Sequence, residues 1–168
     1  MEKYALTGPP GPGKTSVSKL LNENVTALSK YYEEASEGKT KSGEWLVSIE
    51  KLNKILETSD SKIYEGNFAH KLKNINKIIV LRCDPNILKK RLEKRGYKKE
   101  KIMENLEAEA IGLIFSESIS YVGENNVIQL DTSNTDIENI AMNIEKYMDG
   151  KIKVEEEIDY SERILEWY

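Results

Sequence analysis

The feature that most constrains this chain is a glycine-rich run between a short apolar segment and an amphipathic stretch. Residues 8–15 read GPPGPGKT, which fits the pattern G-x-x-x-x-G-K-[ST] without a gap, and Ser16 follows directly. Residues 4–7 read as a buried strand, and residues 15–21 place apolar side chains on one face of a helix. Glycines at such a strand–turn–helix junction let backbone N–H groups converge on an anion, and the helix N-terminus adds a favourable dipole. The motif therefore predicts a phosphate-binding loop (P-loop) for a nucleotide.

Two side chains of the motif carry specific expectations. Lys14 is expected to reach the β- and γ-phosphates, and the hydroxyl of Thr15 is expected to hold Mg²⁺. ATP and Mg²⁺ are therefore the expected cofactors. The alternative is an ordinary proline- and glycine-containing turn in front of a helix.

Length, charge and cysteine content bound the class of protein. The 168 residues fit one domain with a real core. A net charge of −4 argues against broad, non-specific nucleic-acid binding. No apolar run approaches a membrane span, and the N-terminus enters the first strand directly, so we expect neither a membrane segment nor a signal peptide. Cys83 is the only cysteine, so no internal disulfide can form and we expect the protein in a reducing cytoplasm. Cys83 itself is expected to be a small buried hydrophobic residue.

The pattern of apolar segments predicts the fold class. Strands are expected at residues 4–7, 25–28, 62–65, 77–82 and 127–130. The run KIIVLR at residues 77–82 is nearly continuous in apolar residues, which is typical of a buried parallel strand. Because helical patterns separate these strands, we expect an α/β fold, a three-layer α/β/α sandwich around a five-stranded parallel sheet.

Other segments are less regular. Residues 22–61 are expected to form a small helical insertion, with helices near 29–35 and 49–56 and a mobile polar loop at 36–44. One long helix is expected over 98–119, and the capping box Thr135-x-x-Glu138 is expected to open the last helix. The tail, residues 151–168, holds a charge run at 155–157 that is most simply solvated. It also holds four apolar residues that could dock on the body or on a partner: Ile164, Leu165, Trp167 and Tyr168.

The remainder of the chain narrows the kind of P-loop protein. Small GTPases need an Asn-Lys-x-Asp guanine reader, but here Asn76-Lys77 continues into Ile78-Ile79. The length excludes large motor and transporter ATPases. What remains is the nucleoside monophosphate kinase type of P-loop NTPase, in which a short insertion binds the phosphate acceptor and an arginine-bearing lid covers the donor.

Several motifs carry a resemblance to a known family. The P-loop, LRCDP at 81–85 and RLEKRGY at 91–97 resemble the adenylate kinase isoenzyme six family, as do EAEA at 107–110 and the pair Asp131-Thr132. That family includes the coilin-interacting nuclear ATPase and archaeal proteins called "putative adenylate kinases". The resemblance implies phosphoryl transfer between ATP and AMP or another nucleoside monophosphate, together with ATP hydrolysis. It also implies a role in late maturation of the small ribosomal subunit, through ribosomal protein eleven of that subunit on the pre-ribosomal particle.

The resemblance also implies roles for particular positions. Arg95 would cover the bound ATP, in a lid over residues 94–104, and the acceptor region would span residues 28–51. The donor phosphates would be bound by the P-loop residues Gly11, Pro12, Gly13, Lys14, Thr15 and Ser16.

Phosphoryl transfer rests on positioning and on neutralising charge, so cations near the donor are the catalytic candidates. Lys14, Mg²⁺ at Thr15, and Arg91 or Arg95 would supply that neutralisation. The chain has only four arginines against 21 lysines, and the planar fork of arginine suits phosphate. Spaced by four residues, Arg91 and Arg95 would share one helical face and could point at one phosphate chain. The alternative is that both are solvated and pair with Glu93 or Glu100.

Glu65 is the candidate acid of the site. It ends a predicted strand, next to the crevice where such sheets bind ligands. Glu65 could hold a magnesium-bound water or orient the attacking water. The alternative is that it caps the short helix after Gly66.

Two departures from the family leave the acceptor of the phosphate open. The family usually carries a histidine two residues after its acid, whereas this chain has Asn67 there and its only histidine is His70. His70 could take that place only if the short helix after Gly66 is turned inward; otherwise it is expected at the surface or in packing. Residues 22–61 contain no arginine, so Lys30, Lys39 or Lys41 would hold the acceptor phosphate, or else Arg82 and Arg91 would. The rival hypotheses are a nucleotide-switched ribosome assembly factor with little kinase activity and a small-metabolite kinase.

Overall fold

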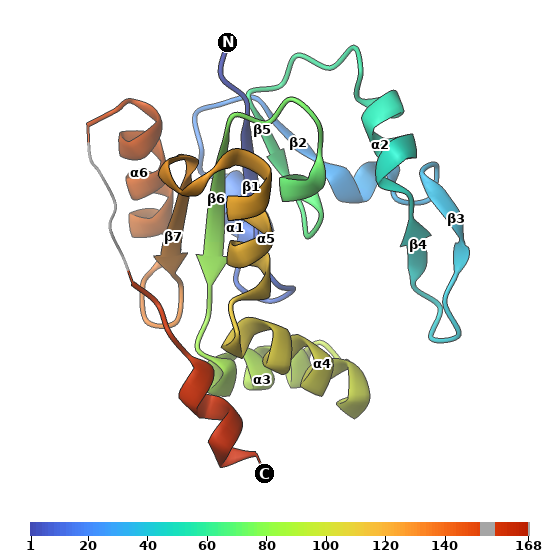
Figure 1. Ribbon diagram of the computed structural model, residues 1–168, viewed down its shortest axis with the longest axis vertical. Helices are drawn as coiled ribbons and strands as arrows, with labels where there is room; N and C mark the ends of the chain where they lie inside the picture. Colours follow the sequence, from blue (N-terminus) through green and yellow to red (C-terminus); the bar gives the residue numbers. More distant parts are fainter. Residues whose placement is uncertain (152–156, 168) are drawn as a thin grey trace.

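The computed structural model describes residues 1–151 and 157–167 and has a parallel β-sheet at its centre (Figure 1). Five strands pair in the order β2-β5-β1-β6-β7, and every pairing is parallel. The strands are β1 (Tyr4–Thr7), β2 (Val25–Ala27), β5 (Ile63–Glu65), β6 (Lys77–Arg82) and β7 (Val127–Asp131). The α-helices are α1 (Lys14–Ser18), α2 (Ile49–Ile55), α3 (Pro85–Lys94), α4 (Lys99–Ala110), α5 (Leu113–Val122) and α6 (Ile137–Met148). Short 3₁₀ helices are η1 (Leu28–Tyr31), η2 (Ala69–Lys71), η3 (Glu124–Asn126) and η4 (Ser161–Glu166). The expected α/β fold with a five-stranded parallel sheet is confirmed.

Alternation of side chains along the strands divides the core between the two faces of the sheet. On β6, Ile79 and Leu81 pack in the apolar cluster that α1 and α6 complete. Ile78 and Val80 pack in the cluster on the opposite face, which α2 and α5 cover. Both faces are therefore buried, and this explains why the sequence of β6 is continuously apolar. No helix in residues 1–151 and 157–167 is long and apolar enough to cross a membrane.

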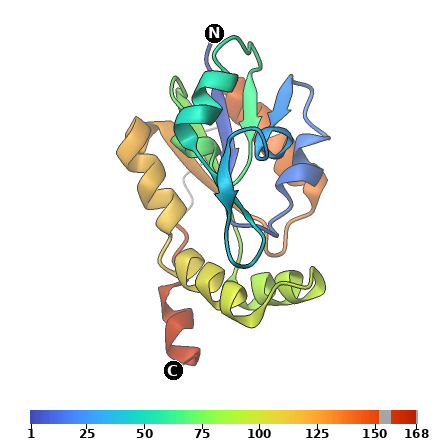
Figure 2. The same cartoon turned by 90° about the vertical axis from the view of Figure 1, so that its right-hand side faces the viewer.

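A third apolar cluster lies beyond the carboxyl ends of the strands, where α3 and α4 pack on each other (Figure 2). Leu88 and Leu92 from α3 meet Ile102 and Leu106 from α4. Cys83 belongs to the same cluster and is fully buried, as expected of a small hydrophobe. The two helices thus form a layer across the end of the sheet at which β1 leads into the P-loop.

The insertion between β2 and β5 differs from its prediction. Residues 36–44, expected as a mobile loop, form most of a hairpin of β3 (Ser36–Lys39) and β4 (Trp45–Val47), which projects from the body in Figure 1. Residues 29–35, expected as a helix, contain three of the four residues of the 3₁₀ helix η1, followed by turns. Of the predicted helices, the one near 49–56 is confirmed as α2. The prediction of a helical insertion is therefore wrong for residues 36–47, because the pairing of the polar strand β3 with the short apolar strand β4 leaves little trace in hydrophobic periodicity.

Two helix boundaries also differ. The helix predicted over 98–119 is two helices, α4 and α5, separated at Gly112, whose φ of 67° lies in the left-handed region. The cap of α6 is Asp136, whose carboxylate accepts a hydrogen bond from the backbone N–H of Asn139, so the predicted capping box at Thr135 is wrong.

The C-terminal segment docks on the body through η4. Trp167 packs against the cluster between α3 and α4, whereas Leu165 remains 79% exposed. Arg163 donates from Nε and Nη2 to the two carboxylate oxygens of Asp84, at 3.1 and 3.0 Å. Residues 155 and 156 of the expected charge run, and Tyr168 of the expected docking residues, lie outside the described residues.

Candidate functional site

The P-loop joins β1 to α1, and two of its glycines are required by geometry. A Cβ at Gly8 would lie 2.6 Å from the backbone oxygen of Leu81 on β6, so a side chain there would collide with the sheet. Gly13 has a φ of 93° immediately before α1, in the left-handed region that L side chains avoid. The loop therefore lies close against the sheet and enters the helix by a turn that glycine allows.

The side chain of Lys14 lies against the backbone of the P-loop. Its side chain is nearly buried, and its Nζ donates hydrogen bonds to the carbonyl oxygens of Gly8 at 3.1 Å and Pro9 at 2.6 Å. Burial lowers the pKa of Lys14 to about 7, although the Glu65 carboxylate opposes this effect. The positive charge of Arg95 lowers the pKa further. The ammonium group thus lies in a desolvated cradle where a multiply charged anion would hold it in its charged form.

Thr15 and Glu65 meet at the mouth of the loop. The Thr15 hydroxyl donates to Oε1 of Glu65 at 3.4 Å, because β5 lies next to β1 in the sheet and ends at the acid. The Tyr32 hydroxyl is close enough to feel this carboxylate: burial and the Glu65 charge raise the pKa of Tyr32 to about 12. A hydroxyl and a carboxylate are oxygen donors of the kind that Mg²⁺ prefers.

No group of three or more histidine, cysteine, aspartate or glutamate side chains that could hold a metal gathers within residues 1–151 and 157–167. A protein site of few oxygen ligands fits Mg²⁺ in particular, since this ion keeps several waters and takes other ligands from substrate phosphates. The side chains present at Thr15 and Glu65 therefore fit a magnesium–nucleotide complex better than a metal held by protein ligands alone.

The two arginines of the predicted lid have different surroundings. Arg91 donates from Nη1 to the backbone oxygen of Gly11 at 3.3 Å and from Nη2 to the backbone oxygen of Thr132 at 3.2 Å. Its guanidinium therefore ties the P-loop to the end of β7. Arg95 follows α3 as its C-cap, is exposed, and lies close enough to Lys14 for its charge to act on the lysine.

Arg82 cannot serve as an acceptor-phosphate ligand, contrary to one expectation. It is 1% exposed, its Nε donates to Glu109 at 3.1 Å, and Nη1 donates to the side chain of Gln129. Glu109 also accepts from the backbone N–H of Cys83 at 2.7 Å. This buried pair joins the end of α4 to the end of β6, and its donors face the interior of the protein.

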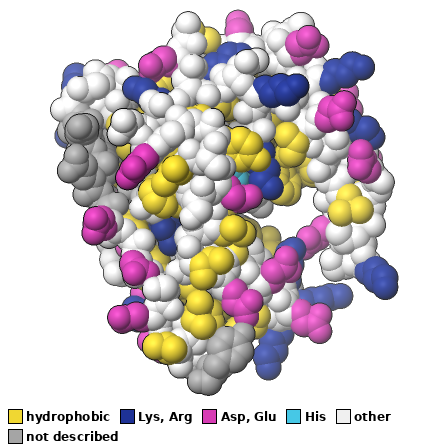
Figure 3. All heavy atoms as spheres, viewed as in Figure 1, with side chains coloured by type: hydrophobic (Ala, Val, Ile, Leu, Met, Phe, Trp, Pro, Cys, Tyr) yellow, Lys and Arg dark blue, Asp and Glu magenta, His cyan; other side chains and the backbone are white. Residues whose placement is uncertain are grey.

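The lysines of the expected acceptor region lie on η1 and on the hairpin. Lys30, Lys39 and Lys41 are all exposed, and Nζ of Lys39 lies 4.4 Å from the centre of the Trp45 ring. At the hairpin turn, Glu44 forms an ion pair with Lys101 of α4 at 3.3 Å. Figure 3 shows a hollow on this face of the molecule, between the body and the projecting hairpin.

His70 is the residue whose environment was least foreseen. It is 2% exposed, with Nδ1 3.2 Å from the Thr7 hydroxyl and Nε2 3.4 Å from Oε1 of Glu117. The expected surface position of His70 is therefore wrong. The ring is packed inside the protein between two polar partners. The only signal in the sequence was its place a few residues after the acid, on the segment that returns the chain to β6.

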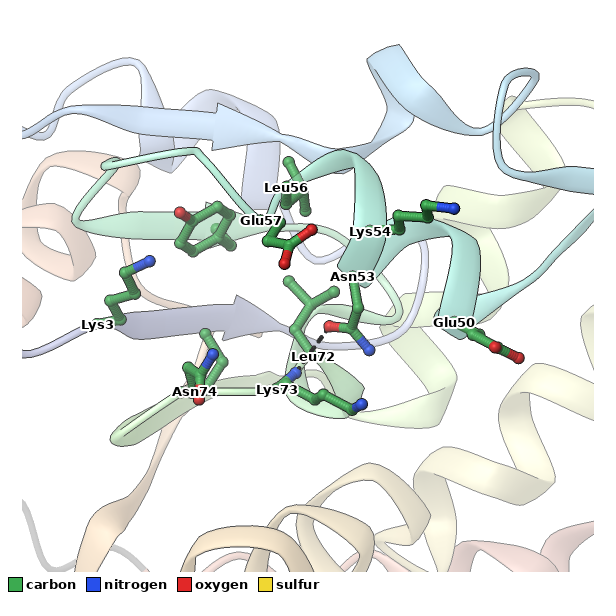
Figure 4. A pocket seen from close by; sticks show the side chains of 11 residues that line it. Lys3, Glu50, Asn53, Lys54, Leu56, Glu57, Leu72, Lys73 and Asn74 are labelled. Carbon is green, nitrogen blue, oxygen red and sulfur yellow. Dashed lines mark hydrogen bonds between the residues drawn. The ribbon is translucent and has the colours of Figure 1, made fainter.

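A cavity of about 430 Å³ lies elsewhere, at the amino-terminal end of the sheet (Figure 4). Tyr64 and Leu72 line it together with Lys3, Asn53 and Lys54, and no residue of the P-loop does. Open α/β sheets bind their ligands at the carboxyl ends of the strands, so this cavity does not compete with the P-loop as the nucleotide site.

Comparison with known proteins agrees with this geometry. Residues 5–112 match the family described as "AAA domain". The chain is 35% identical to a curated protein of Methanocaldococcus jannaschii called "Putative adenylate kinase", over 98% of this chain and 96% of that protein. It is 36% identical to a protein of the same name from Methanococcus maripaludis, over 88% of each chain. Among solved structures, a shikimate kinase from Bacteroides thetaiotaomicron superposes with a TM-score of 0.55 at 16% identity, over 88% of this chain and 98% of that one. This last likeness concerns the fold alone.

Proposed function

Because the chain belongs to the archaeal family whose curated members are called "Putative adenylate kinase", we propose that it transfers the terminal phosphate of ATP to AMP or another nucleoside monophosphate. The observation that carries this proposal is the environment of Lys14. A buried ammonium whose pKa is lowered to about 7, beside the Thr15–Glu65 pair, suits a site that is completed by a polyanion. Family membership and the P-loop kinase fold support a phosphotransferase, and the acceptor is the part that we propose.

The roles of the donor site follow from the contacts. The P-loop backbone and Lys14 would hold the donor phosphates, with Ser16, at the start of α1, beside them. Thr15 would hold Mg²⁺, which when bound neutralises charge on the phosphate oxygens, and Glu65 would orient one of its waters. Arg95 would close over the donor from the end of α3, in a lid spanning residues 94–104.

Arg91 has a supporting role in this proposal. Its guanidinium already binds the backbone of Gly11 and Thr132, so it holds the P-loop in shape and adds positive charge behind it. The acceptor would bind in the region 28–51, against the exposed lysines of η1 and the hairpin. Lysine provides a point charge without the directional fork of arginine, so we expect weaker selection of the acceptor.

The arginine-free acceptor region supports one alternative, a nucleotide-switched assembly factor with slow catalysis and a ribosomal partner. The test is the production of ADP from ATP with and without AMP, measured with wild-type protein and with Lys14→Met. A kinase makes ADP only when AMP is present, and the variant makes none. Turnover that needs a small-subunit ribosomal protein or precursor RNA, and not AMP, would contradict the proposal and favour the assembly factor. AMP-independent turnover by wild-type protein would mean that water is the acceptor.

A further inference from the structure

A buried chain of polar side chains lies where β1 becomes the P-loop. Thr7, the last residue of β1, is fully buried, and its hydroxyl lies 3.2 Å from Nδ1 of His70 in η2. The other ring nitrogen of His70 lies 3.4 Å from Oε1 of Glu117 on α5. The Tyr121 ring packs edge-to-face with the imidazole, at 6.3 Å between ring centres. Three elements that are distant in sequence thus meet at one histidine.

The hydrogen-bond partners restrict where protons can lie on the side chains of Thr7, His70 and Glu117. A carboxylate only accepts hydrogen bonds, so Nε2 of His70 must carry a proton to bind Glu117. Burial lowers the pKa of His70, although Glu117 opposes this effect, and so the neutral ring is favoured. In the neutral ring with a proton on Nε2, Nδ1 is an acceptor, and the Thr7 hydroxyl shares its one proton between Nδ1 at 3.2 Å and the backbone oxygen of Asn67 at 3.3 Å. Glu117 therefore orients the ring, and the ring holds Thr7.

These hydrogen-bonded side chains also affect the position of Glu65, through the short loop that joins Glu65 to His70. Glu65 ends β5, and the backbone N–H of Gly66 donates to the Leu6 oxygen at 3.1 Å. The loop then continues to η2, where His70 is bound to Thr7. Both ends of the segment 65–70 are thereby fixed to the last two residues of β1. The Glu65 carboxylate, at one end, meets the Thr15 hydroxyl at 3.4 Å.

We propose that His70 is a positioning residue that holds the segment 65–70 against the end of β1, so that Glu65 stays beside Thr15. This inference rests on the proposed function, because it gives Glu65 and Thr15 a shared magnesium-binding role. An apolar ring would fill the same space but could not bind Thr7, and the C-terminal end of the segment would lose its anchor, leaving the contacts of Gly66 with Leu6 and of the Asn67 oxygen with the Thr7 hydroxyl. Outer residues that orient metal ligands commonly change metal affinity without touching the metal.

Three substitutions separate this role from simple packing. In His70→Asn the amide oxygen lies where Nδ1 was and can accept from Thr7, while the contact with Glu117 is lost. In His70→Gln the longer amide reaches toward Glu117, while the contact with Thr7 is lost. His70→Phe keeps only the volume. Lys71→Met is the matched control, because Lys71 is the next residue in the chain and also pairs with Glu117, at 3.6 Å.

The experiment measures the Kd of ADP with and without Mg²⁺, beside thermal unfolding of each variant. Mg²⁺ is expected to lower the Kd of ADP for the wild-type protein. In His70→Phe and His70→Gln, we expect this decrease in Kd to be roughly tenfold smaller, while the Kd of ADP without Mg²⁺ stays within about twofold of the wild-type value. His70→Asn and Lys71→Met should keep most of the decrease. Under the proposed function, kcat for transfer to AMP should fall by about 10–100-fold in the same two variants, with KM for ATP changed less than about threefold.

The outcomes are distinct. If Mg²⁺ lowers the Kd of ADP as much in His70→Phe as in wild-type protein, the positioning role is overturned. It is also overturned if all three His70 variants lose the effect of Mg²⁺ in proportion to the fall in their melting temperatures. Wild-type protein whose ADP affinity does not respond to Mg²⁺ would overturn it as well. A wild-type protein that binds Mg²⁺–ADP but transfers no phosphate to AMP would refute the proposed function alone, and the Kd comparison would still decide the role of His70.

Discussion

Lys14→Met should make the ligand-free protein more stable, because the wild-type lysine is buried in a state unfavourable to its charge. Burial lowers the pKa of Lys14 from an ordinary value of 10.5 to about 7. A difference of that size corresponds to about 5 kcal/mol of folding free energy that the charged form costs. Methionine fills a similar volume and carries no charge. It also lacks the hydrogen bonds to the Gly8 and Pro9 oxygens, whose loss costs roughly 1–2 kcal/mol. The expected net gain at pH 6 is therefore about 3 kcal/mol.

The gain should depend on pH in a defined direction. Below pH 7 the lysine is charged in both the folded and the unfolded protein, so the full cost applies. Between pH 7 and 10.5 only the unfolded chain keeps the proton, and wild-type stability then rises by about 1.4 kcal/mol per pH unit from this residue. Since methionine does not titrate, the advantage of the variant should shrink by about 3 kcal/mol between pH 7 and pH 9.

Urea unfolding at pH 6, 7, 8 and 9 measures this directly. Comparing wild-type protein with Lys14→Met cancels the titration of other groups, and Lys19→Met, at an exposed lysine after the same helix, is the control. The reasoning is refuted if Lys14→Met is less stable than wild type at pH 6, or if the difference does not change between pH 7 and pH 9. Either result would mean that Lys14 is not held as a desolvated cation.

Three further predictions concern the lid and the framework. Arg95→Ala should raise KM for ATP and slow transfer, and the exposed Lys94→Ala is its control; equal kinetics in the two variants would remove Arg95 from the site. Arg82→Leu should lower the free energy of unfolding by about 3–5 kcal/mol, because it leaves Glu109 buried without its cation. A loss below about 1 kcal/mol in denaturant would contradict that account. Gly112→Ala should lower stability by about 1–2 kcal/mol, because φ at this position is 67°; an unchanged melting temperature would speak against strain there.

The sheet was predictable because its strands are defined by local sequence. Both faces of β6 are buried, so Ile78, Ile79 and Val80 leave an uninterrupted apolar run that needs no knowledge of the neighbouring strands. The P-loop is equally local, since its glycines and the residues that follow are consecutive. The hairpin was missed because β3 is polar, β4 is only three apolar residues long, and their pairing is a contact between segments with no common period.

The remainder of the site depends on contacts that no local pattern encodes. Thr15 meets Glu65 because β5 lies beside β1, and the alternation of strands and helices does not determine that order. The burial of Arg82 depends on Glu109, which the break at Gly112 places at the end of α4. His70 was assigned to the surface or to packing because a lone histidine carries little information until Thr7 and Glu117 are seen beside it.

The measurement that tests the central claim most directly is incubation of the protein with Mg²⁺ and ADP alone, followed by ³¹P NMR. A nucleoside monophosphate kinase moves the β-phosphate of one ADP to another, so two ADP become one ATP and one AMP. We predict that wild-type protein forms ATP and AMP in equal amounts, and that Lys14→Met purified in the same way forms neither. An ATP-hydrolysing assembly factor cannot make ATP from ADP. Absence of ATP here, together with no transfer from ATP to any other nucleoside monophosphate while nucleotide binding is intact, would contradict the account.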